Sequence, residues 1–479
     1  MQRDSIPAQS FVMQYREACR QTDELFSLIR SECLTVRPVR ERHRLLFYIG
    51  HLEAFDWNLL SARLFELPAF NASFDTLFAF GIDPVGGGLP TDEPKDWPAL
   101  SEIYAYRDAV RERIESAIPD VDFSRSRHSA GDADAATLLQ VVIEHRQMHA
   151  ETLAYLVHQM PLAQKIVPDK AALPARAMRL VAASPANAAD AAFTVSGRSP
   201  SNGSPTLPGM ACVAAGDVQI GLPIEAGVDE STSSQPMQQG ARAFGWDNEF
   251  VDAGKQRVAV AEFLIDRHMV SNRDFLVFVN AGGYSRPEYW RPDDWAWRCA
   301  ADVTHPAFWE PQGEGWALRT MFTLRSLPLD WPVYVSHAEA EAYAYFVGKR
   351  LPSESEWMRA AIGASDIDRP PVEGNFDFRH WDPVPVDAYP QNRSAFDVHG
   401  QFGNGWEWTA DFFTPFSGFQ PFSFYPGYSA DFFDNRHFVM KGGSPRTAAR
   451  MLRPTFRNWF QPHYPYVYAG FRCAADLPK

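Results

Sequence analysis

Long apolar runs and an excess of basic residues are both missing from this sequence of 479 residues. No segment approaches the roughly 18 consecutive apolar residues that a membrane-spanning helix needs. The N-terminal residues MQRDSIPAQSFV lack the basic and apolar regions of a signal peptide. Asp and Glu (59) outnumber Lys and Arg (45), so the formal net charge is −14. A surface of that sign disfavours nucleic acids and anionic membranes as partners.

Cysteine is also scarce. The five residues are far apart and odd in number: Cys19, Cys33, Cys212, Cys299 and Cys473. That pattern predicts neither a disulfide framework nor a CxxC zinc site. We therefore expect a reduced, cytoplasmic protein stabilised by packed cores, for which a hydrophobic content of 46% is ample.

The chain divides into two parts of different character. Residues 8–162 repeat apolar residues at spacings of three and four, with later runs near 98–117 and 133–160, which predicts an up-and-down bundle of four helices. A stretch rich in Ala, Pro, Ser and Gly follows this part. We predict a helical domain over 1–165, a linker over 166–208 and a second domain over 209–479.

Aromatic residues and long loops dominate the second part. Strand-like pieces occur at VQIGL (218–222) and VAVAEFLI (258–265), and helical patterns occur near 271–281 and 336–348. These features predict an irregular α+β domain whose order comes from aromatic packing.

Two histidines stand four residues apart in the helical run VVIEHRQMHAETL (141–153). Residues at that spacing share one helix face, so His145 and His149 are expected to point into the bundle. There they can converge on one metal ion, and the alternative is that each is a satisfied core histidine. An earlier run, from Phe47 to Asn58, places His51 on a similar inward stripe. Three imidazoles suit Fe(II), Zn(II) or Cu(II), and ligand type alone does not separate these metals.

Two carboxylates flank the paired histidines on other faces of the same helix. Glu144 and Glu151 are expected either to support the metal ligands from behind or, as the simpler interpretation, to face solvent.

Several motifs in order along the chain, together with the histidine pattern, carry a resemblance to a known family. The pattern of His51 plus HxxxHxE resembles the DinB-type bundle of the ergothioneine-synthase (sulfoxide synthase) family. The second part resembles the C-type-lectin-like domain shared with formylglycine-generating enzyme, at FGWDNE (244–249), GKRLPSESEWMRAA (348–361), GNGWEWTADFF (403–413), KGGSPRT (441–447) and RPTFRNWF (453–460). The fold implied is a DinB-like four-helix bundle followed by a formylglycine-generating-enzyme-like domain.

The resemblance also implies a reaction. In this family an iron(II) ion held by three histidines, here His51, His145 and His149, uses O2 to join a chalcogen donor to C2 of the imidazole of hercynine. Asn458 and Trp459 match positions that help to hold hercynine, and an aromatic face suits its quaternary ammonium group.

Departures from the family pattern point to the donor. Members that use γ-glutamylcysteine carry an aspartate and an arginine where this chain has Phe460 and Tyr464, and arginines in a loop that here reads GGGLPTDEP (86–94). A charged dipeptide in a pocket without these partners would leave buried charges unpaired, at about 3–5 kcal/mol each. Aromatic walls and the Gly86–Gly88 loop suit a neutral sugar, so the chain resembles the selenoneine synthase branch, whose donor is a selenosugar.

Two further departures concern the chemistry. Met148 stands where thiol-using members have a glutamine beside the second histidine, so a substrate contact there must differ. Phe416 aligns with the family's tyrosine after the WEWT motif, and Tyr425 and Tyr428 are the nearby candidates for a replacement proton donor.

Three functions remain open from the sequence. The first is iron-dependent C–Se bond formation between a selenosugar and hercynine, and the second is an ergothioneine-type sulfoxide synthase with a different thiol donor. The third is a ligand-binding protein without catalysis. Oxidation of a peptidyl cysteine, the reaction of formylglycine-generating enzyme, is disfavoured because SPRTAARMLRPTFRN (444–458) contains no cysteine.

Overall fold

The computed structural model describes residues 5–80, 89–123, 133–168, 209–224, 244–363, 371 and 373–477. The chain forms two compact units, one made of Met1–Val167 with Phe422–Pro426 and the other of Pro168–Pro421 with Gly427–Lys479. Most of the predicted linker lies outside the described residues. None of the helices in the described part of the chain is both long and apolar enough to cross a membrane.

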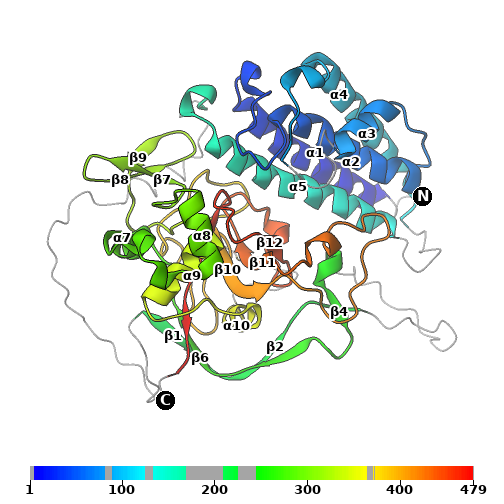
Figure 1. The fold of residues 1–479 in the computed structure, drawn as a ribbon. Helices are drawn as coiled ribbons and strands as arrows, with labels where there is room; N and C mark the ends of the chain where they lie inside the picture. The colour runs from blue at the N-terminus through cyan, green and yellow to red at the C-terminus, as the bar shows by residue number, and fades with distance from the viewer. Residues whose placement is uncertain are drawn as a thin grey trace. The chain divides into compact units, whose positions relative to one another are not determined.

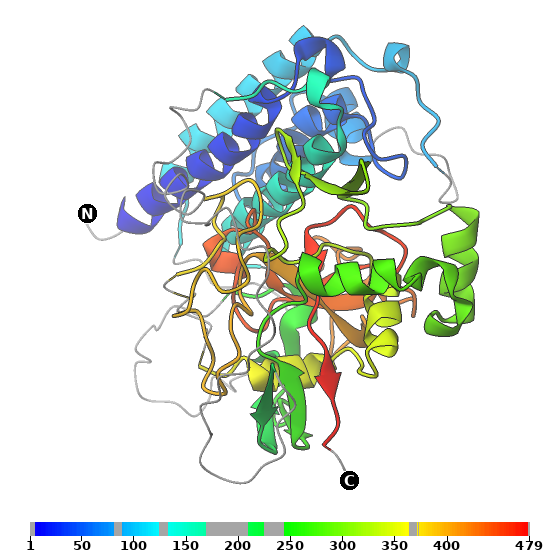
Figure 2. The ribbon, with the colours of Figure 1, turned by 90° about the vertical axis from the view of Figure 1, so that its left-hand side faces the viewer.

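Helices build the first unit, as the periodicity predicts. Helix α2 packs against α3, α4 and α5, and α1 packs against α5. Figures 1 and 2 both show the long helices lying side by side. The described helices are α1 (Ser5–Ser27), α2 (Leu45–Arg63), α3 (Ala72–Phe80), α4 (Leu100–Ala117) and α5 (Ala135–Gln159).

Helix α2 is buried on nearly all sides because three helices surround it. The prediction that residues from Phe47 to Asn58 form one inward-facing stripe is wrong for its last residue. Asn58 is exposed, and its side-chain amide donates a hydrogen bond of 2.9 Å to the carbonyl of Asp75. Helix α5 begins where expected, since the Asp134 carboxylate accepts from the N–H of Thr137 at 2.7 Å.

Short strands in several small sheets form the second unit (Figure 1). The central sheet has the strand order β12-β11-β10-β13, in which β10 and β13 are parallel. Its strands are β10 (Gly405–Phe412), β11 (Phe438–Gly443), β12 (Asn458–Phe460) and β13 (Ala469–Gly470).

The remaining strands lie in sheets of two or three. They are β1 (Met210–Val213), β6 (Phe263–Asp266) and β14 (Ala474–Ala475); β2 (Gly216–Gln219) and β5 (Arg257–Val260); β3 (Leu222–Ile224) and β4 (Phe250–Asp252); and β7 (Trp309–Gln312), β8 (Gly315–Arg319) and β9 (Leu324–Ser326). The run VAVAEFLI is not one strand, because the chain passes from β5 to a different sheet at β6.

Short helices cover the second unit. The two predicted helices are present as α7 (Asn272–Asn280) and α9 (His337–Phe346). The sequence reasoning missed α8 (Pro292–Ala300) and α10 (Glu354–Ala360), which are too short to show a clear period. Capping signals were available for α10, since Ser353 and Glu356 form a reciprocal capping box.

Candidate metal centre

Three histidines of the first unit converge. His51 comes from α2, and His145 and His149 come from α5. One nitrogen from each ring lies within 4.8 Å of the other two, and Nε2 of His51 is 3.2 Å from Nε2 of His149. Two imidazole nitrogens at right angles on one ion, each about 2.1 Å from it, would be roughly 3 Å apart. The cluster therefore fits a single metal ion.

All three imidazoles are neutral in the folded protein. Burial lowers the pKa of His51 to about 4, although a hydrogen bond to the main chain at Phe78 opposes this shift. Burial also lowers the pKa of His145 and of His149 well below the usual value, and the neighbouring histidines and Arg146 add to the effect. A neutral ring keeps a lone pair for a metal, so no proton has to be displaced on binding.

Different contacts orient the rings of His51 and His145. Nδ1 of His51 donates to the carbonyl of Phe78 at 2.8 Å, which leaves the Nε2 lone pair facing His149. The Phe55 ring stacks on His145 with centroids 3.5 Å apart and an interplanar angle of 14°. Among the described residues, Nδ1 of His145 and Nδ1 of His149 have no hydrogen-bond partner.

A buried charged cluster lies beside the histidines. The guanidinium of Arg146 on α5 binds the carboxylates of Glu53 and Asp56 on α2, and all three side chains are fully buried. Arg146 also donates to the hydroxyl of Tyr15 on α1 at 3.3 Å. The sequence reasoning missed this cluster, although Glu53 and Asp56 stand three apart on one helix face. It links the helix that carries His51 to the helix that carries the other two.

The other residues predicted on α5 lie close to the histidines in sequence. Met148 is half-buried. Glu144 and Glu151 are 1% and 8% exposed, so the interpretation that they face solvent is wrong. Polar residues are tolerated on these faces because they have partners, such as the Gln140 amide that donates to Glu144 at 3.3 Å.

The two candidate tyrosines belong to different units. Tyr425 lies in the segment Phe422–Pro426 of the first unit, and its ring centroid is 5.2 Å from that of Phe55 and 6.4 Å from that of His145. Tyr428 is buried in the second unit, where it stacks on Trp246 at 4.0 Å.

The predicted hercynine residues lie on β12. Trp459 stacks on Phe413 with centroids 4.1 Å apart and lies 5.4 Å from the ring of Tyr428. The side-chain oxygen of the half-buried Asn458 accepts from the N–H of Trp459 at 2.9 Å. These residues form an aromatic wall with one amide beside it.

The predicted donor residues are also aromatic and uncharged. Phe460 and Tyr464 stack on each other, with centroids 5.2 Å apart and an angle of 11°. Phe416, at the position predicted to match the family's tyrosine, lies under the Arg457 guanidinium at 4.2 Å. The Gly86–Gly88 part of the predicted donor loop lies outside the described residues.

The described part of that loop is held by arginines from another segment. The buried Asp92 carboxylate binds both Arg37 and Arg44 and accepts from the Trp97 indole at 2.8 Å. Arg37 also donates to the carbonyl of Pro90 at 3.0 Å. These cations are thus used to fix the loop.

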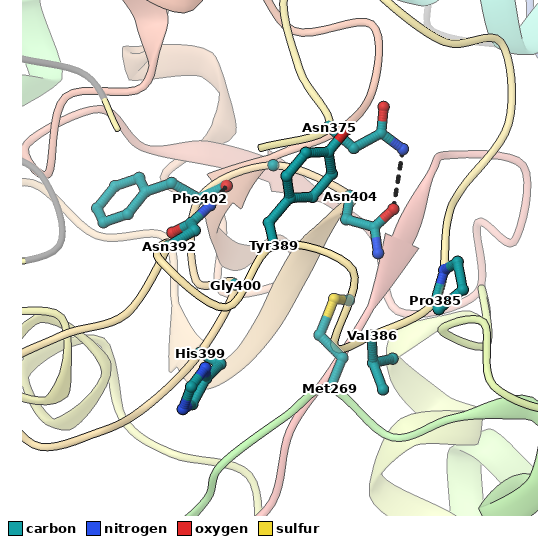
Figure 3. A pocket seen from close by; sticks show the side chains of 11 residues that line it. Met269, Asn375, Pro385, Val386, Tyr389, Asn392, His399, Gly400, Phe402 and Asn404 are labelled. Carbon is teal, nitrogen blue, oxygen red and sulfur yellow. Dashed lines mark hydrogen bonds between the residues drawn. The ribbon is translucent and has the colours of Figure 1, made fainter. Parts of the chain in front are cut away.

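Cavities also occur in the second unit. One of about 20 Å³, room for about one water molecule, lies beside the amide pair Asn375 and Asn404, which is joined at 2.9 Å (Figure 3). Another, of about 490 Å³, is lined by Arg291, whose guanidinium already pairs with Glu341 at 2.8 Å. Neither of these two cavities is lined by the three converging histidines.

Comparison with known proteins identifies both parts of the chain. Residues 195–477 match the sulfatase-modifying factor enzyme 1-like domain, and residues 14–153 match the DinB superfamily. Hercynine oxygenase of Mycolicibacterium thermoresistibile is 38% identical over 239 residues, covering 46% of this chain and 52% of that protein. Ergothioneine biosynthesis protein 1 of Neurospora crassa is 25% identical over 536 residues, covering 94% of this chain and 56% of that protein.

A formylglycine-generating enzyme, that of Thermomonospora curvata, is 29% identical over 273 residues, covering 46% of this chain and 84% of that protein. The chain spans about half the length of the hercynine oxygenase and of the ergothioneine biosynthesis protein.

Proposed function

Since the chain belongs to the sulfatase-modifying factor enzyme 1-like domain family, we propose that it is an iron(II)- and O2-dependent enzyme that joins a chalcogen donor to C2 of the hercynine imidazole. The DinB match and the similarity to ergothioneine biosynthesis proteins and hercynine oxygenases support membership of the ergothioneine-synthase family. The observation that carries the proposal is the convergence of three neutral imidazoles, His51, His145 and His149, within 4.8 Å.

In this proposal the three histidines hold iron(II), which when bound supplies the activation of O2. Overall, hercynine, a selenol or thiol and O2 give the joined selenoxide or sulfoxide and water. The C2–H and chalcogen–H bonds break and the carbon–chalcogen bond forms. One oxygen atom goes to the chalcogen and the other leaves as water.

The chain's own residues orient the histidines and move protons. The His51 ring is fixed with its proton on Nδ1 by the Phe78 carbonyl, so Nε2 is free to bind the metal. Tyr425 is the proposed proton donor, because its ring lies 6.4 Å from that of His145 in the same unit. Trp459 and Asn458 are proposed to receive the quaternary ammonium of hercynine, which favours an aromatic face over a counter-charge.

For the donor we propose a selenosugar. Phe460 and Tyr464 present stacked rings, and rings bind a hydroxylated sugar without needing an ionic partner. Two arginines that contact the described part of the donor loop, Arg37 and Arg44, already neutralise Asp92. A γ-glutamylcysteine donor would bring two carboxylates that call for free guanidinium groups.

Turnover of hercynine tests the proposal. The iron-loaded protein should consume hercynine and O2 with a selenosugar, and mass spectrometry should show the joined product. His145→Ala should lose both iron and turnover while the fold remains. Iron content equal to wild type in that variant would refute the metal assignment, and ligand binding without any turnover would favour the non-catalytic interpretation.

Comparing kcat/KM for a selenosugar and for γ-glutamylcysteine tests the donor. The selenosugar should be preferred, and Phe460→Asp with Tyr464→Arg should weaken its use because a desolvated charge would face a neutral ring. Preference of the wild type for the dipeptide would replace the selenosugar proposal with an ergothioneine-type sulfoxide synthase.

Paired tyrosine variants test the proton donor. Tyr425→Phe should lower kcat by about 10²-fold or more, the usual contribution of a general acid. Tyr428→Phe serves as the matched control, since that ring stacks on Trp246 and Phe keeps the stacking. Equal kcat values for Tyr425→Phe and wild type would remove Tyr425 from the mechanism.

A further inference from the structure

We propose that the main-chain carbonyl of Phe78 positions His51 for metal binding and that Gly50 is the residue that admits this contact. The inference rests on the proposed metal site and extends it to residues that carry no metal ligand themselves. In this proposal the short helix α3, which carries Phe78, holds the His51 ring in the orientation that metal binding needs.

The contact itself is a single hydrogen bond to a rigid acceptor. Nδ1 of His51 donates to the Phe78 carbonyl at 2.8 Å. Among the described residues, Nδ1 of His145 and Nδ1 of His149 have no comparable partner. His51 is thus the proposed ligand whose protonated nitrogen is set by a hydrogen bond from outside the cluster. Losing such a contact typically weakens metal binding by about 10–100-fold.

Gly50 lies against the Phe78 ring. A Cβ built on Gly50 would lie 2.4 Å from Cγ and Cδ1 of Phe78, much closer than carbon atoms can approach. The Phe78 ring is fully buried and stacks with Trp97 and Tyr106 at centroid distances of 6.2 and 6.0 Å. It therefore has no open space to turn into, and a side chain on Gly50 must push Phe78 away from α2.

Helix α3 is anchored at Asp75, one turn before Phe78. This anchor holds the main-chain carbonyl of Phe78 in place. The Asn58 amide donates to the Asp75 carbonyl at 2.9 Å, and the Tyr106 hydroxyl donates to the Asp75 carboxylate at 2.7 Å. With α3 anchored there, displacement of Phe78 by a new Cβ would move the hydrogen-bond acceptor of His51 more than it moves the rest of the helix.

Metal affinity of the full-length protein tests the inference, with Co(II) as the probe followed by its absorption spectrum. Gly50→Ala should weaken Co(II) binding by about 10–100-fold and alter the spectrum. Adding Phe78→Ala removes the ring but keeps the carbonyl, so the double variant should recover affinity relative to Gly50→Ala alone. If the first double variant folds poorly, Gly50→Ala with Phe78→Leu should show the same direction of recovery.

The second unit offers a matched control. A Cβ on Gly283 would lie 2.3 Å from the ring of Phe278, the same kind of clash far in sequence from any metal ligand. Gly283→Ala should lower thermal stability and leave the Co(II) dissociation constant unchanged. Unchanged affinity in Gly50→Ala, or no recovery in both double variants, would overturn the positioning role.

His145→Ala separates this result from failure of the metal site. If that variant binds Co(II) as tightly as wild type, the proposed metal site is wrong and the positioning role falls with it. If it loses Co(II) and Gly50→Ala does not, only the positioning role is wrong.

Discussion

The two units bury their charges in different ways. In the first unit, Arg146 gathers Glu53 and Asp56 into one cluster that joins α2 to α5. Arg111 extends it from α4, donating to Glu53 at 2.9 Å. The cluster adjoins the three converging histidines, since Arg146 directly follows His145 in the chain.

In the second unit the buried charges form smaller groups, each of which joins segments that are distant in the chain. Arg472 binds both oxygens of Glu407 at 2.6 Å each, and Arg453 binds Glu249 at 2.5 and 2.8 Å. Arg472 also donates to main-chain carbonyls, including that of His399 at 2.9 Å. These guanidinium groups join short segments that are far apart in the chain, in a unit where long helices are missing.

This difference between the units predicts that the buried charges of the first unit affect metal binding, whereas those of the second unit affect only stability. Regular helices already define the first unit, so its charge cluster chiefly fixes how α2 meets α5 and hence where His51 lies. Irregular segments have no such frame, so the ion pairs of the second unit act mainly on stability. Breaking a buried charge should therefore change metal affinity in the first unit only.

The largest effect is expected from Arg146→Met. The change leaves the carboxylates of Glu53 and Asp56 buried without their main partner, which should cost about 3–5 kcal/mol of unfolding free energy. Metal affinity should fall as well, because the contact between α2 and α5 loosens. Hydrogen exchange of α5 and Co(II) titration measure the two effects.

A surface arginine provides the control for that change. Arg20 pairs with Glu17 at 2.6 Å on the exposed side of α1. Arg20→Met should change stability by less than about 1 kcal/mol and leave Co(II) affinity intact. Wild-type affinity in Arg146→Met would show that the cluster does not position the histidines.

The helices and the pairing of His145 with His149 on one helix face could be predicted because both depend on local spacing. The period of 3.6 places His145 and His149 together whatever the rest of the fold does. Arg146 could not be assigned in the same way, since its partners Glu53 and Asp56 lie about 90 residues earlier and only packing brings them close. For the same reason the simpler interpretation of the sequence places Glu144 in solvent, whereas the fold buries it.

The second unit was less predictable. Its strands are two to eight residues long, and pairs such as β10 with β13 join segments that no local pattern connects. The aromatic motif residues Trp459 and Phe460 were found only through the resemblance. Phe413, the stacking partner of Trp459, follows from the fold, which places the two segments side by side.

A smaller effect is expected from Glu407→Gln. Gln keeps one acceptor for Arg472 and for the Trp357 indole, which donates to Glu407 at 2.7 Å, but it removes the charge. The expected loss is about 1.5–3 kcal/mol, the range for hydrogen bonds to charged groups. Hydrogen exchange of β10 should report it, and Co(II) affinity should stay at the wild-type value.

An exposed ion pair in the same unit serves as the comparison for Glu407→Gln. Asp397 pairs with Arg267 at the surface. Asp397→Asn should have little effect on hydrogen exchange of β10. A loss of metal affinity in Glu407→Gln would contradict the separation of stability from function.

The smallest effect at neutral pH is expected from a buried lysine of the central sheet. Lys441 on β11 donates to the carbonyls of Pro454 and Phe456 at 2.8 and 2.7 Å and lies 3.4 Å from the Glu354 carboxylate. Arg457 already neutralises that carboxylate at 3.0 Å. Burial, together with this competing cation, lowers the pKa of Lys441 from its usual 10.5 to about 8, although Glu354 opposes the shift.

The stability of the second unit should therefore rise with pH between about 8 and 10.5. In that window the unfolded chain keeps the Lys441 proton and the folded chain has lost it, so raising the pH favours the folded state by up to about 1.4 kcal/mol per pH unit. Lys441→Met should flatten this rise in urea unfolding followed across the window. In Arg457→Met, which lacks the competing cation, the rise should begin at a higher pH. If wild type and Lys441→Met show parallel pH profiles of stability, Lys441 stays protonated in the folded protein across this window. In that case groups besides Glu354 stabilise its positive charge.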